Sequence, residues 1–327
     1  MRRLGAFRGF VLLAWLAVLW PTWGQGPSAA AFDCATVAQI PLAECRALVA
    51  LYQSTDGPHW LISGSWLATA TPCTWYGVRC DGGHVTALIL VSNRLQGELP
   101  PELGDLTRLR WLELQGNLLR GSIPPTLGNL TSLWMLSLYD NQLSGDIPAS
   151  LGNLAELRYL YLHGNRLSGP IPSALGNLAQ LQTLYLQENQ LEGDVPAALG
   201  NLAGLEYLCL MDNRLRGEIP PELGNLVGLR ELILSKNQLR GEVPSALGSL
   251  SRLERLYLSD NPLTGALPLS LTNLTYLAHF RYDGTGLCEP VHWGFWQWLA
   301  GVGERRGTGL PCRQPFAYLP LAAFTPP

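Results

Sequence analysis

A single repeating pattern of apolar and polar positions dominates the chain. Asparagine recurs every 24 residues without an insertion, at Asn93, Asn117, Asn141, Asn165, Asn189, Asn213, Asn237 and Asn261. A glycine follows each asparagine by four residues, from Gly97 to Gly265, and a proline follows by seven, from Pro100 to Pro268. A fixed period of this length is the signature of a repeat array, so we expect a stack of similar coils.

The apolar positions of one unit predict its local structure. The unit around Asn117 has seven of them, at Leu109, Leu112, Leu114, Leu119, Ile123, Leu127 and Leu130. The alternation of Leu112, Glu113 and Leu114 predicts a strand whose leucines point inward. Burying these side chains yields roughly 10 to 20 kcal/mol, which is less than the cost of ordering 24 residues. The coils must therefore stack, with parallel strands about 4.8 Å apart and with each asparagine amide bonded to backbone groups of its turn and of the adjacent coil.

The unit reads L-x-x-L-x-L-x-x-N-x-L-x-G-x-I-P-x-x-L-G-N-L, and it resembles the plant-type class of extracellular leucine-rich repeats. The signal and cap style also resemble secreted bacterial members of that class. The resemblance implies an α/β solenoid, a right-handed superhelix with a parallel sheet on its concave face and disulfide-bonded caps at both ends. On this basis we expect an N-terminal cap over residues 32–83, eight repeats over 84–277, a C-terminal cap over 278–312 and a Pro-rich tail over 313–327.

The first 31 residues are predicted to be a secretory signal peptide. Three arginines, Arg2, Arg3 and Arg8, precede an apolar run over residues 10–20, and small residues at 29–31 offer a cleavage site. The apolar run is about half the ~20 residues that a spanning helix needs, so an uncleaved membrane anchor is the weaker alternative. No later segment is apolar enough to span a membrane. We therefore expect a secreted, extracellular protein.

The caps are identified by cysteines and tryptophans. The segment from Cys73 to Cys80 is similar to the paired-cysteine cap that precedes the first repeat in this class. Residues 42–53 have helical periodicity, and we expect one apolar face that contains Leu42, Cys45, Leu48, Val49 and Tyr52. Packing over the first coil is the favoured role of Trp60, Trp66 and Trp75, with sugar binding as the alternative. At the far end, Thr285 takes the asparagine position, Phe280 and Tyr282 replace inward leucines, and the aromatic segment of Trp293, Phe295, Trp296 and Trp298 is expected to cover the last coil.

Seven cysteines are expected to give three disulfides and one free thiol. The caps lie roughly 40 Å apart by strand spacing, whereas a disulfide needs Cα atoms within about 7 Å, so bonds between the caps are excluded. Three pairings remain open to the first four cysteines. We favour Cys34 with Cys45 and Cys73 with Cys80, which leaves Cys288 with Cys312. Cys209 lies in an outward position among the repeats, so we expect it to be free and partly accessible, with a dimer through this thiol as a possible consequence.

Composition and motifs exclude several classes of function. The 22 basic and 25 acidic residues nearly balance, so binding nucleic acid by phosphate neutralisation is not expected. The chain is 47% apolar and 14% charged, which is typical of a folded protein with a large core. It carries no H-E-x-x-H, G-x-S-x-G, P-loop or C-x-x-C motif, and no partners for a metal site at His163 are evident. We therefore predict a protein that is not an enzyme and has no cofactor and no metal.

The outward positions of the strands predict a binding surface. Aromatic residues and methionines gather at the positions six, four and two residues before each asparagine, chiefly in the coils of Asn117 to Asn213. Glu231, Lys236, Arg255 and Arg281 make the later coils more charged. The candidate concave-face residues are Trp111, Met135, Tyr139, Tyr159, Tyr161, His163, Tyr185, Tyr207, Met211 and Tyr257. An apolar centre with a polar flank is typical of recognition surfaces, although tyrosine also favours strands for packing reasons alone.

The sequence therefore predicts a secreted repeat protein that recognises an extracellular protein or peptide on its concave face. Two alternatives stay open. An inhibitor of an extracellular hydrolase is one, and charged concave residues facing a basic enzyme would favour it. A surface adhesion or scaffold protein without a specific small ligand is the other, which uniform repeats suit.

Overall fold

The structure is a computed structural model that describes residues 32–312. The predicted signal peptide, residues 1–31, and the Pro-rich tail, residues 313–327, lie outside the described residues. The seven apolar positions of the repeat form one continuous core along the stack: in the coil of Asn117, Leu112, Leu114 and Leu127 are fully buried. The leucines of the other coils are buried in the same way.

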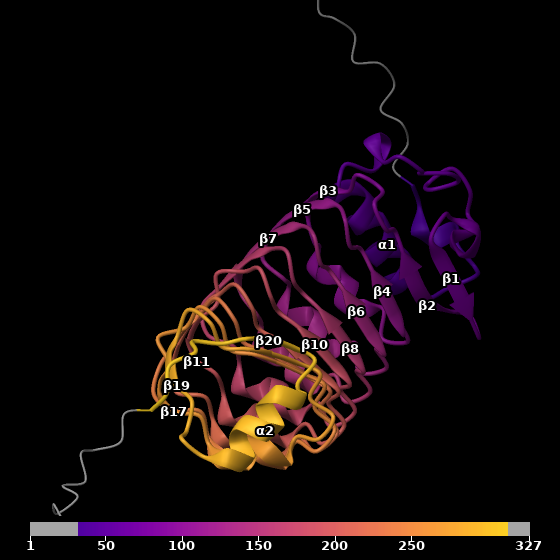
Figure 1. Cartoon of the computed structure of the whole chain (residues 1–327). Helices are drawn as coiled ribbons and strands as arrows, with labels where there is room; N and C mark the ends of the chain where they lie inside the picture. Colours follow the sequence, from indigo (N-terminus) through magenta and orange to yellow (C-terminus); the bar gives the residue numbers. More distant parts are fainter. Residues whose placement is uncertain (1–31, 313–327) are drawn as a thin grey trace, which may run out of the picture. The chain divides into compact units, whose positions relative to one another are not determined.

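The main sheet runs along one face of the stack and has the strand order β1-β2-β4-β6-β8-β10-β12-β14-β16-β18-β20. Apart from β1, every strand pairs in parallel with a neighbour one coil away, and Figure 1 shows β4, β6 and β8 side by side on the concave face. Its strands are β1 (Val78–Asp81), β2 (His84–Ile89), β4 (Trp111–Glu113), β6 (Met135–Ser137), β8 (Tyr159–Tyr161), β10 (Thr183–Tyr185), β12 (Tyr207–Cys209), β14 (Glu231–Ile233), β16 (Arg255–Tyr257), β18 (His279–Arg281) and β20 (Glu304–Arg306).

The first pair differs from the rest, because β1 and β2 form an antiparallel hairpin. Gly82 and Gly83 connect the two strands, and both have positive φ, at 57° and 79°. A two-residue loop with both φ angles positive suits the twist of a hairpin, and glycine adopts it without steric cost. The N-terminal edge of the parallel ladder is thereby covered by a strand of the cap.

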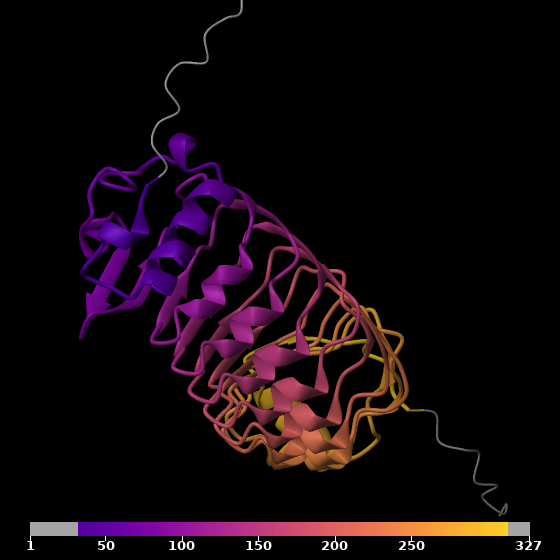
Figure 2. The same ribbon diagram turned by 180° about the vertical axis from the view of Figure 1, so that it is seen from behind.

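Each coil continues through a second short strand and a 3-10 helix. The second strands form three small sheets. The four-stranded sheet contains β3 (Gln96–Glu98), β5 (Leu118–Gly121), β7 (Gln142–Asp146) and β9 (Arg166–Ser168), and the three-stranded sheet contains β11 (Glu192–Asp194), β13 (Arg214–Gly217) and β15 (Gln238–Leu239). The two-stranded sheet contains β17 (Thr264–Ala266) and β19 (Gly286–Cys288). The helices are η4 (Pro101–Asp105), η5 (Pro125–Asn129), η6 (Ala149–Asn153), η7 (Ser173–Asn177), η8 (Ala197–Asn201), η9 (Pro221–Asn225), η10 (Ser245–Ser249) and η11 (Leu269–Asn273). Figure 2 shows them as a row behind the main sheet. A proline in extended conformation precedes each helix, and each helix has only five residues, which is short, as 3-10 helices usually are.

The repeated asparagines connect adjacent coils through buried hydrogen bonds. The Asn165 side-chain oxygen accepts from the Leu143 backbone N–H at 3.0 Å. Its amide nitrogen donates to the backbone carbonyls of Leu138, one coil back, and Leu162, in its own turn. The same three bonds recur at Asn141, Asn189, Asn213 and Asn237. The predicted role of the asparagines in joining turn and adjacent coil is confirmed.

A second glycine position, inside the 3-10 helices, sets how closely the coils approach. A Cβ on Gly176 of η7 would lie 2.3 Å from the backbone oxygen of Ala198 in the next coil. Any side chain there would force the helices apart. At the equivalent position of η11 the residue is Thr272, because α2, rather than another 3-10 helix, packs beyond that coil.

The N-terminal cap contains η1 (Cys34–Thr36), α1 (Leu42–Ser54), η2 (Gly57–His59) and η3 (Pro72–Thr74). The predicted inward face of α1 was partly wrong. Leu42 is exposed, and Val49 and Tyr52 are half-buried, whereas Glu44 is buried. The Glu44 carboxylate is satisfied there, since it contacts His84 Nδ1 at 2.6 Å and accepts from the Val85 backbone N–H at 2.7 Å.

The tryptophans of this cap are packed rather than presented to solvent. Trp60, Trp66 and Trp75 are at most 5% exposed, and their ring centroids follow one another at 5.0 Å. Their indole N–H groups donate to the backbone oxygens of Thr55, Tyr76 and Thr69 respectively. The packing interpretation therefore agrees with the structure, and the sugar-binding alternative does not.

The C-terminal cap contains α2 (Trp293–Gly301), which covers the end of the stack in Figure 1. Phe280, Tyr282 and Phe295 are fully buried, and the Thr285 hydroxyl bonds to the Tyr282 carbonyl in place of the missing asparagine. Only part of the aromatic segment acts as a lid, since Trp293 is 77% exposed.

Disulfides stabilise both caps, and the structure forms three of them, Cys34–Cys45, Cys73–Cys80 and Cys288–Cys312. These are the pairs favoured from the sequence. Over residues 32–312, no helix has both the length and the apolar character needed to cross a membrane.

Candidate binding surface on the concave sheet

The register of the main sheet brings the outward residues together in straight columns. Tyr161 lies beside Tyr185, and Tyr185 lies beside Cys209, because the strands pair at a constant offset of 24 residues. A second column, two residues earlier in each strand, contains Trp111, Met135 and Tyr159. The leucines between these positions point into the core, so the strands present the aromatic side chains to the concave side.

Most of the predicted aromatic residues form one network of ring contacts, which we call the aromatic surface. Its members are Trp111, Trp134, Tyr139, Tyr159, Tyr161, His163 and Tyr185. The Tyr161 and Tyr185 centroids are 5.5 Å apart, and Tyr139 stacks on His163 at 4.4 Å with an interplanar angle of 9°. Met135 lies in register between Trp111 and Tyr159. The sheet therefore joins these side chains into a continuous half-buried surface.

Trp134 connects Trp111 to the tyrosines of this network, and it is not among the residues predicted from the sequence. It precedes β6 by one residue, and its ring lies 6.0 Å from Trp111 and 4.8 Å from Tyr159. The Arg158 guanidinium lies 5.8 Å from the Trp134 ring. Trp134 is the only tryptophan seven residues before a repeated asparagine, and this departure from the polar residues usual there is a signal that could have identified it.

A hollow of about 440 Å³ lies at the centre of the aromatic surface, and we call it the central hollow. Its lining residues are Gln115, Met135, Ser137, Tyr139, Tyr161, His163, Tyr185 and Gln187. Among the described residues, only five buried side-chain polar atoms have no hydrogen-bond partner, and four of them line this hollow: Gln115 Oε1, Ser137 Oγ, His163 Nδ1 and Gln187 Oε1. Unpaired buried polar atoms are costly. Their convergence on one hollow makes it the candidate binding site of the concave sheet.

The two glutamines were not among the predicted site residues. The Gln115 side-chain N–H group donates to the Glu113 carboxylate at 3.5 Å, so its oxygen is turned away from that group. Glutamine is common on exposed strands, and no pattern in the sequence distinguishes Gln115 and Gln187 from solvated side chains. Only the three-dimensional arrangement shows that their oxygens are buried.

Burial shifts the proton equilibria of the groups at the hollow. It lowers the pKa of His163 below its usual 6.5, an effect that the carboxylates of Asp140 and Glu188 oppose. Burial also raises the pKa of Tyr185 to about 12, with a smaller contribution from Glu231. Burial raises the pKa of Tyr161 as well, so at neutral pH Tyr161 and Tyr185 carry their protons and His163 is uncharged.

Cys209 is free, as expected, but the expectation that its thiol is accessible was wrong. The residue is 6% exposed, because Tyr185 and Ile233 flank it in the column on either side. Burial raises the pKa of the thiol to about 11. A buried, protonated thiol is poorly suited to form a bond between two molecules.

Three of the predicted residues lie outside the aromatic surface. Tyr207 and Met211 are half-buried in the coil of Asn213, beyond the last ring of the network. Tyr257 lies three coils beyond Tyr185, where the Arg281 guanidinium is 4.7 Å from its ring. The structure thus assigns Tyr257 to the charged part of the sheet.

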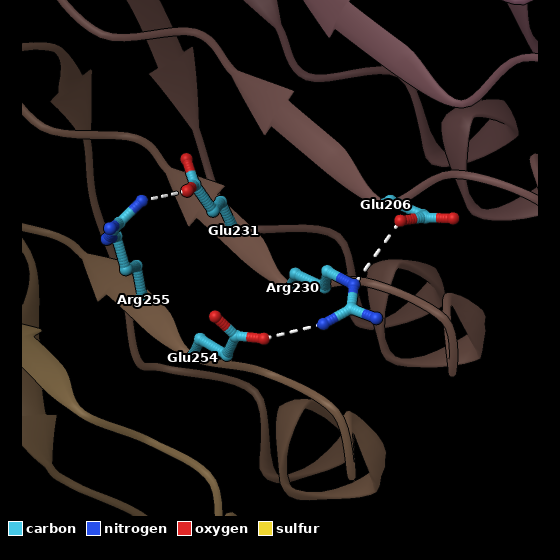
Figure 3. Close-up of polar contacts among 5 residues, drawn as sticks. All are labelled: Glu206, Arg230, Glu231, Glu254 and Arg255. Carbon is cyan, nitrogen blue, oxygen red and sulfur yellow. Dashed lines mark hydrogen bonds and ion pairs between the residues drawn. The ribbon is translucent and has the colours of Figure 1, made fainter.

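In the C-terminal part of the sheet, charged side chains pair between neighbouring coils. Figure 3 shows Arg230 between Glu206, at 3.3 Å, and Glu254, at 2.7 Å, and Arg255 beside Glu231. Glu304 of β20 pairs with Arg281 and with His279, and these two groups lower the pKa of its carboxyl. The described residues include no group of three or more His, Cys, Asp or Glu side chains arranged to hold a metal ion.

Family models agree with this geometry. Leucine rich repeat models match residues 107–167, 155–215, 228–250 and 252–274, and a leucine rich repeat N-terminal domain model matches residues 42–81. The chain is a leucine-rich-repeat protein. Its repeats resemble those of plant receptor ectodomains, as the motif predicted.

Three solved structures illustrate how the leucine-rich-repeat protein relates to others. The ectodomain of the membrane receptor kinase GASSHO1/SCHENGEN3 from Arabidopsis thaliana, in complex with CASPARIAN STRIP INTEGRITY FACTOR 2, is 40% identical over 69% of this chain, with a TM-score of 0.63. The plant peptide hormone receptor RGFR1, in complex with RGF2, is 37% identical over 62% of this chain, with a TM-score of 0.60. A plant ice-binding protein is 27% identical over 86% of this chain and all of its own length, with a TM-score of 0.65.

The leucine-rich-repeat protein spans only part of the length of several relatives. It spans 30% of the GASSHO1/SCHENGEN3 chain and 32% of the RGFR1 chain. It spans 38% of Leucine-rich repeat protein 2 from Arabidopsis thaliana, to which it is 44% identical over 85 residues.

Proposed function

We propose that this leucine-rich-repeat protein is a secreted recognition protein that binds an extracellular peptide or protein segment along its concave face. The observation that carries the proposal is the convergence of the aromatic surface with four unpaired polar atoms on one hollow. Rigid aromatic side chains contribute large contact area at low entropic cost, and they are frequent among residues that dominate binding energy. The function proposed is recognition, without catalysis.

The solved relatives support a peptide as the partner. One of them is described as a peptide hormone receptor, and it was solved in complex with RGF2. The hollow has a volume of about 440 Å³, which suits a few side chains of an extended segment. The concave sheet offers such a segment a path across successive coils.

The hydrolase-inhibitor alternative is less well supported. It depends on free concave charges that face a basic enzyme, whereas Arg230, Glu231 and Arg255 pair with neighbouring coils and the centre of the concave face is aromatic. The adhesion or scaffold alternative does not explain why unpaired polar atoms gather at one place. Peptide recognition accounts for both parts of the sheet.

The test is selection from a library of random displayed peptides on the purified protein, followed by affinity measurements on variants. We expect enriched peptides whose affinity falls by about thirtyfold, or about 2 kcal/mol, in Tyr161→Ala and in Tyr185→Ala. The control is Arg120→Ala, which removes an exposed side chain on β5, away from the concave face. Thermal unfolding of each variant shows whether the fold is kept.

The same measurements contradict the proposal if all three variants bind the enriched peptides equally well. That result would place peptide binding away from the aromatic surface. It would leave the aromatic residues as strand formers that pack well on a pleated surface.

A further inference from the structure

The central hollow is uncharged at its walls and surrounded by carboxylates. None of its lining residues is an arginine, a lysine or an acid. Glu113 lies beside Gln115, and Asp140 and Glu188 are close enough to act on the proton equilibrium of His163. A ligand group in this hollow therefore experiences a negative field, which favours a cation and disfavours an anion.

Aromatic rings line the hollow and can interact with such a cation, although His163 already covers one face of Tyr139. Tyr139, Tyr161 and Tyr185 surround His163, with ring centroids 4.4, 6.3 and 5.9 Å from the imidazole. The face of an aromatic ring attracts ammonium and guanidinium groups. His163, being neutral at pH 7, adds no positive charge that would oppose this attraction.

The same column of the sheet already holds a guanidinium elsewhere. At Tyr257 the Arg281 side chain, from the next coil, places its guanidinium carbon 4.7 Å from the ring centroid. Tyr161 and Tyr185 occupy equivalent positions, but the next residues in their column are Tyr185 and Cys209, which are not basic. At Tyr257 the next residue in the column is the arginine that contacts the ring. At Tyr161 and Tyr185 the next residue in the column carries no positive charge.

The unpaired atoms complete the complementarity. The side-chain oxygens of Gln115 and Gln187 can only accept hydrogen bonds, and the Ser137 hydroxyl and a neutral imidazole nitrogen of His163 can also accept. A guanidinium carries five N–H donors in one plane and no acceptor. A guanidinium can therefore donate to acceptors of adjacent coils, such as His163 and Gln187, whereas a carboxylate or phosphate would bring no donor to any of these atoms.

We propose that the central hollow binds the guanidinium group of an arginine side chain on the partner. This inference rests on the proposed peptide recognition and makes it specific: the peptide carries an arginine that the concave face reads through Tyr161, Tyr185, His163 and Gln187. Lysine is the weaker ligand, because its ammonium has three donors and lacks the planar fork.

The test uses a probe that is independent of any selected peptide. N-acetyl-arginine amide carries only the guanidinium charge, and N-acetyl-citrulline amide has nearly the same shape without that charge. In NMR titrations of the purified protein at pH 7.5, we expect the arginine probe to bind about tenfold more tightly than the citrulline probe. N-acetyl-lysine amide is expected to fall between them.

Two nearly isosteric variants locate the site. Gln187→Met removes the acceptor in the coil next to His163 at little change of volume and is expected to weaken the arginine probe about fivefold, whereas Gln115→Met, three coils away, is expected to leave it nearly unchanged. Gln142→Met is the matched control, since Gln142 lies on β7, outside the main sheet. Equal affinities for the arginine and citrulline probes, or equal affinities in all three folded variants, would overturn the inference.

The outcomes separate this inference from the proposed function. Displayed peptides that depend on Tyr161 and Tyr185 but contain no arginine would overturn the inference and leave peptide recognition standing. An arginine probe that binds in the hollow, combined with displayed peptides that ignore both tyrosines, would support the cation site and overturn peptide recognition on this face.

Discussion

The two halves of the concave sheet are built on the same coils but treat their polar groups in opposite ways. Around Tyr161, aromatic rings enclose a hollow in which four buried polar atoms lack partners. Around Arg255, charged side chains find partners one coil away, as Figure 3 shows for Arg230 and its two glutamates. In the C-terminal half most charged groups pair within the protein and, among the buried side-chain polar atoms of residues 32–312, only Arg281 Nε lacks a partner there, whereas in the aromatic half four buried polar atoms have no partner in the protein.

This difference separates recognition from stability within one sheet. The backbone ladder and the leucine core continue unchanged through both halves. Only the outward columns change, from Tyr161 and Tyr185 to Glu231 and Arg255. The cost of the unpaired groups is therefore confined to the outward side of the sheet, because each coil is also held by its own core and its asparagine bonds.

The largest expected effect tests whether the two halves share one scaffold. Asn165→Leu, beneath the aromatic half, and Asn237→Leu, beneath the charged half, each leave a backbone N–H and two carbonyls without their partner. We expect each variant to lose about 3 to 5 kcal/mol of unfolding free energy. Denaturant unfolding, with hydrogen exchange to locate the loosened coils, measures both. Clearly unequal losses would show that the scaffold differs between the halves.

The next effect is a difference in pH response. The pKa of His163 is lower in the folded protein than in the unfolded chain, so the unfolded chain binds the proton more readily. The contribution of neutral His163 to stability is therefore complete above pH 6.5 and is lost as the pH falls through the folded pKa. Folded Glu304 also has a lowered pKa, through Arg281 and His279. Its contribution is complete above pH 4.5 and is lost only as the pH falls through the folded pKa.

Thermal unfolding between about pH 7.5 and about pH 3.5 checks this order. His163→Gln is expected to reduce the loss of stability near pH 6, and Glu304→Gln to reduce the loss below pH 4.5. If His163→Gln leaves the profile near pH 6 unchanged, the burial of the imidazole has no energetic consequence there.

A smaller effect distinguishes the kinds of contact. A double-mutant cycle on Glu231 and Arg255 is expected to give about 0.2 to 1 kcal/mol, because the arginine is partly exposed. A cycle on Tyr161 and Tyr185 is expected to give about 0.5 to 1.5 kcal/mol. Salt at about 1 M should reduce the first coupling and leave the second unchanged. Equal salt dependence of both couplings would contradict the assignment of ion pairs to one half and ring contacts to the other.

The smallest effect is expected at the boundary between the halves, at Cys209. Because the thiol is buried and its pKa is raised to about 11, it should react slowly with a thiol reagent at pH 7.5. Non-reducing electrophoresis should show the monomer for the natural protein and for Cys209→Ser alike. A disulfide-linked dimer that disappears in Cys209→Ser would show that the sheet opens at this coil.

Much of this architecture follows from the sequence because the repeat has one length. A period of 24 residues without insertions fixes the register of every strand, so the pattern alone predicts that Tyr161 and Tyr185 lie side by side. The asparagine bonds were also predictable, since a buried amide at a turn must find backbone partners.

Features outside the period were not predictable in this way. Leu42 was placed inward on α1 by its apolar character, but Glu44 is the buried residue because His84 and Val85, distant in the sequence, satisfy it. Cys209 was expected to be accessible because it occupies an outward position. The structure buries it because Tyr185 and Ile233 pack over its small side chain, and that packing depends on side-chain conformations that the pattern does not give. The hollow itself depends on where the oxygens of Gln115 and Gln187 point, which a pattern of residue types does not contain.

The close approach of the 3-10 helices at Gly176 and its equivalents has a consequence for how such a protein changes over generations. Every junction between repeats has the same shape, so a stretch of DNA that encodes one whole coil can be duplicated or lost without creating a new kind of junction. Adding a coil after Asn213 would move the self-paired half away by one strand spacing, about 4.8 Å. The central hollow would be unchanged, whereas the length of the concave sheet beside it would differ.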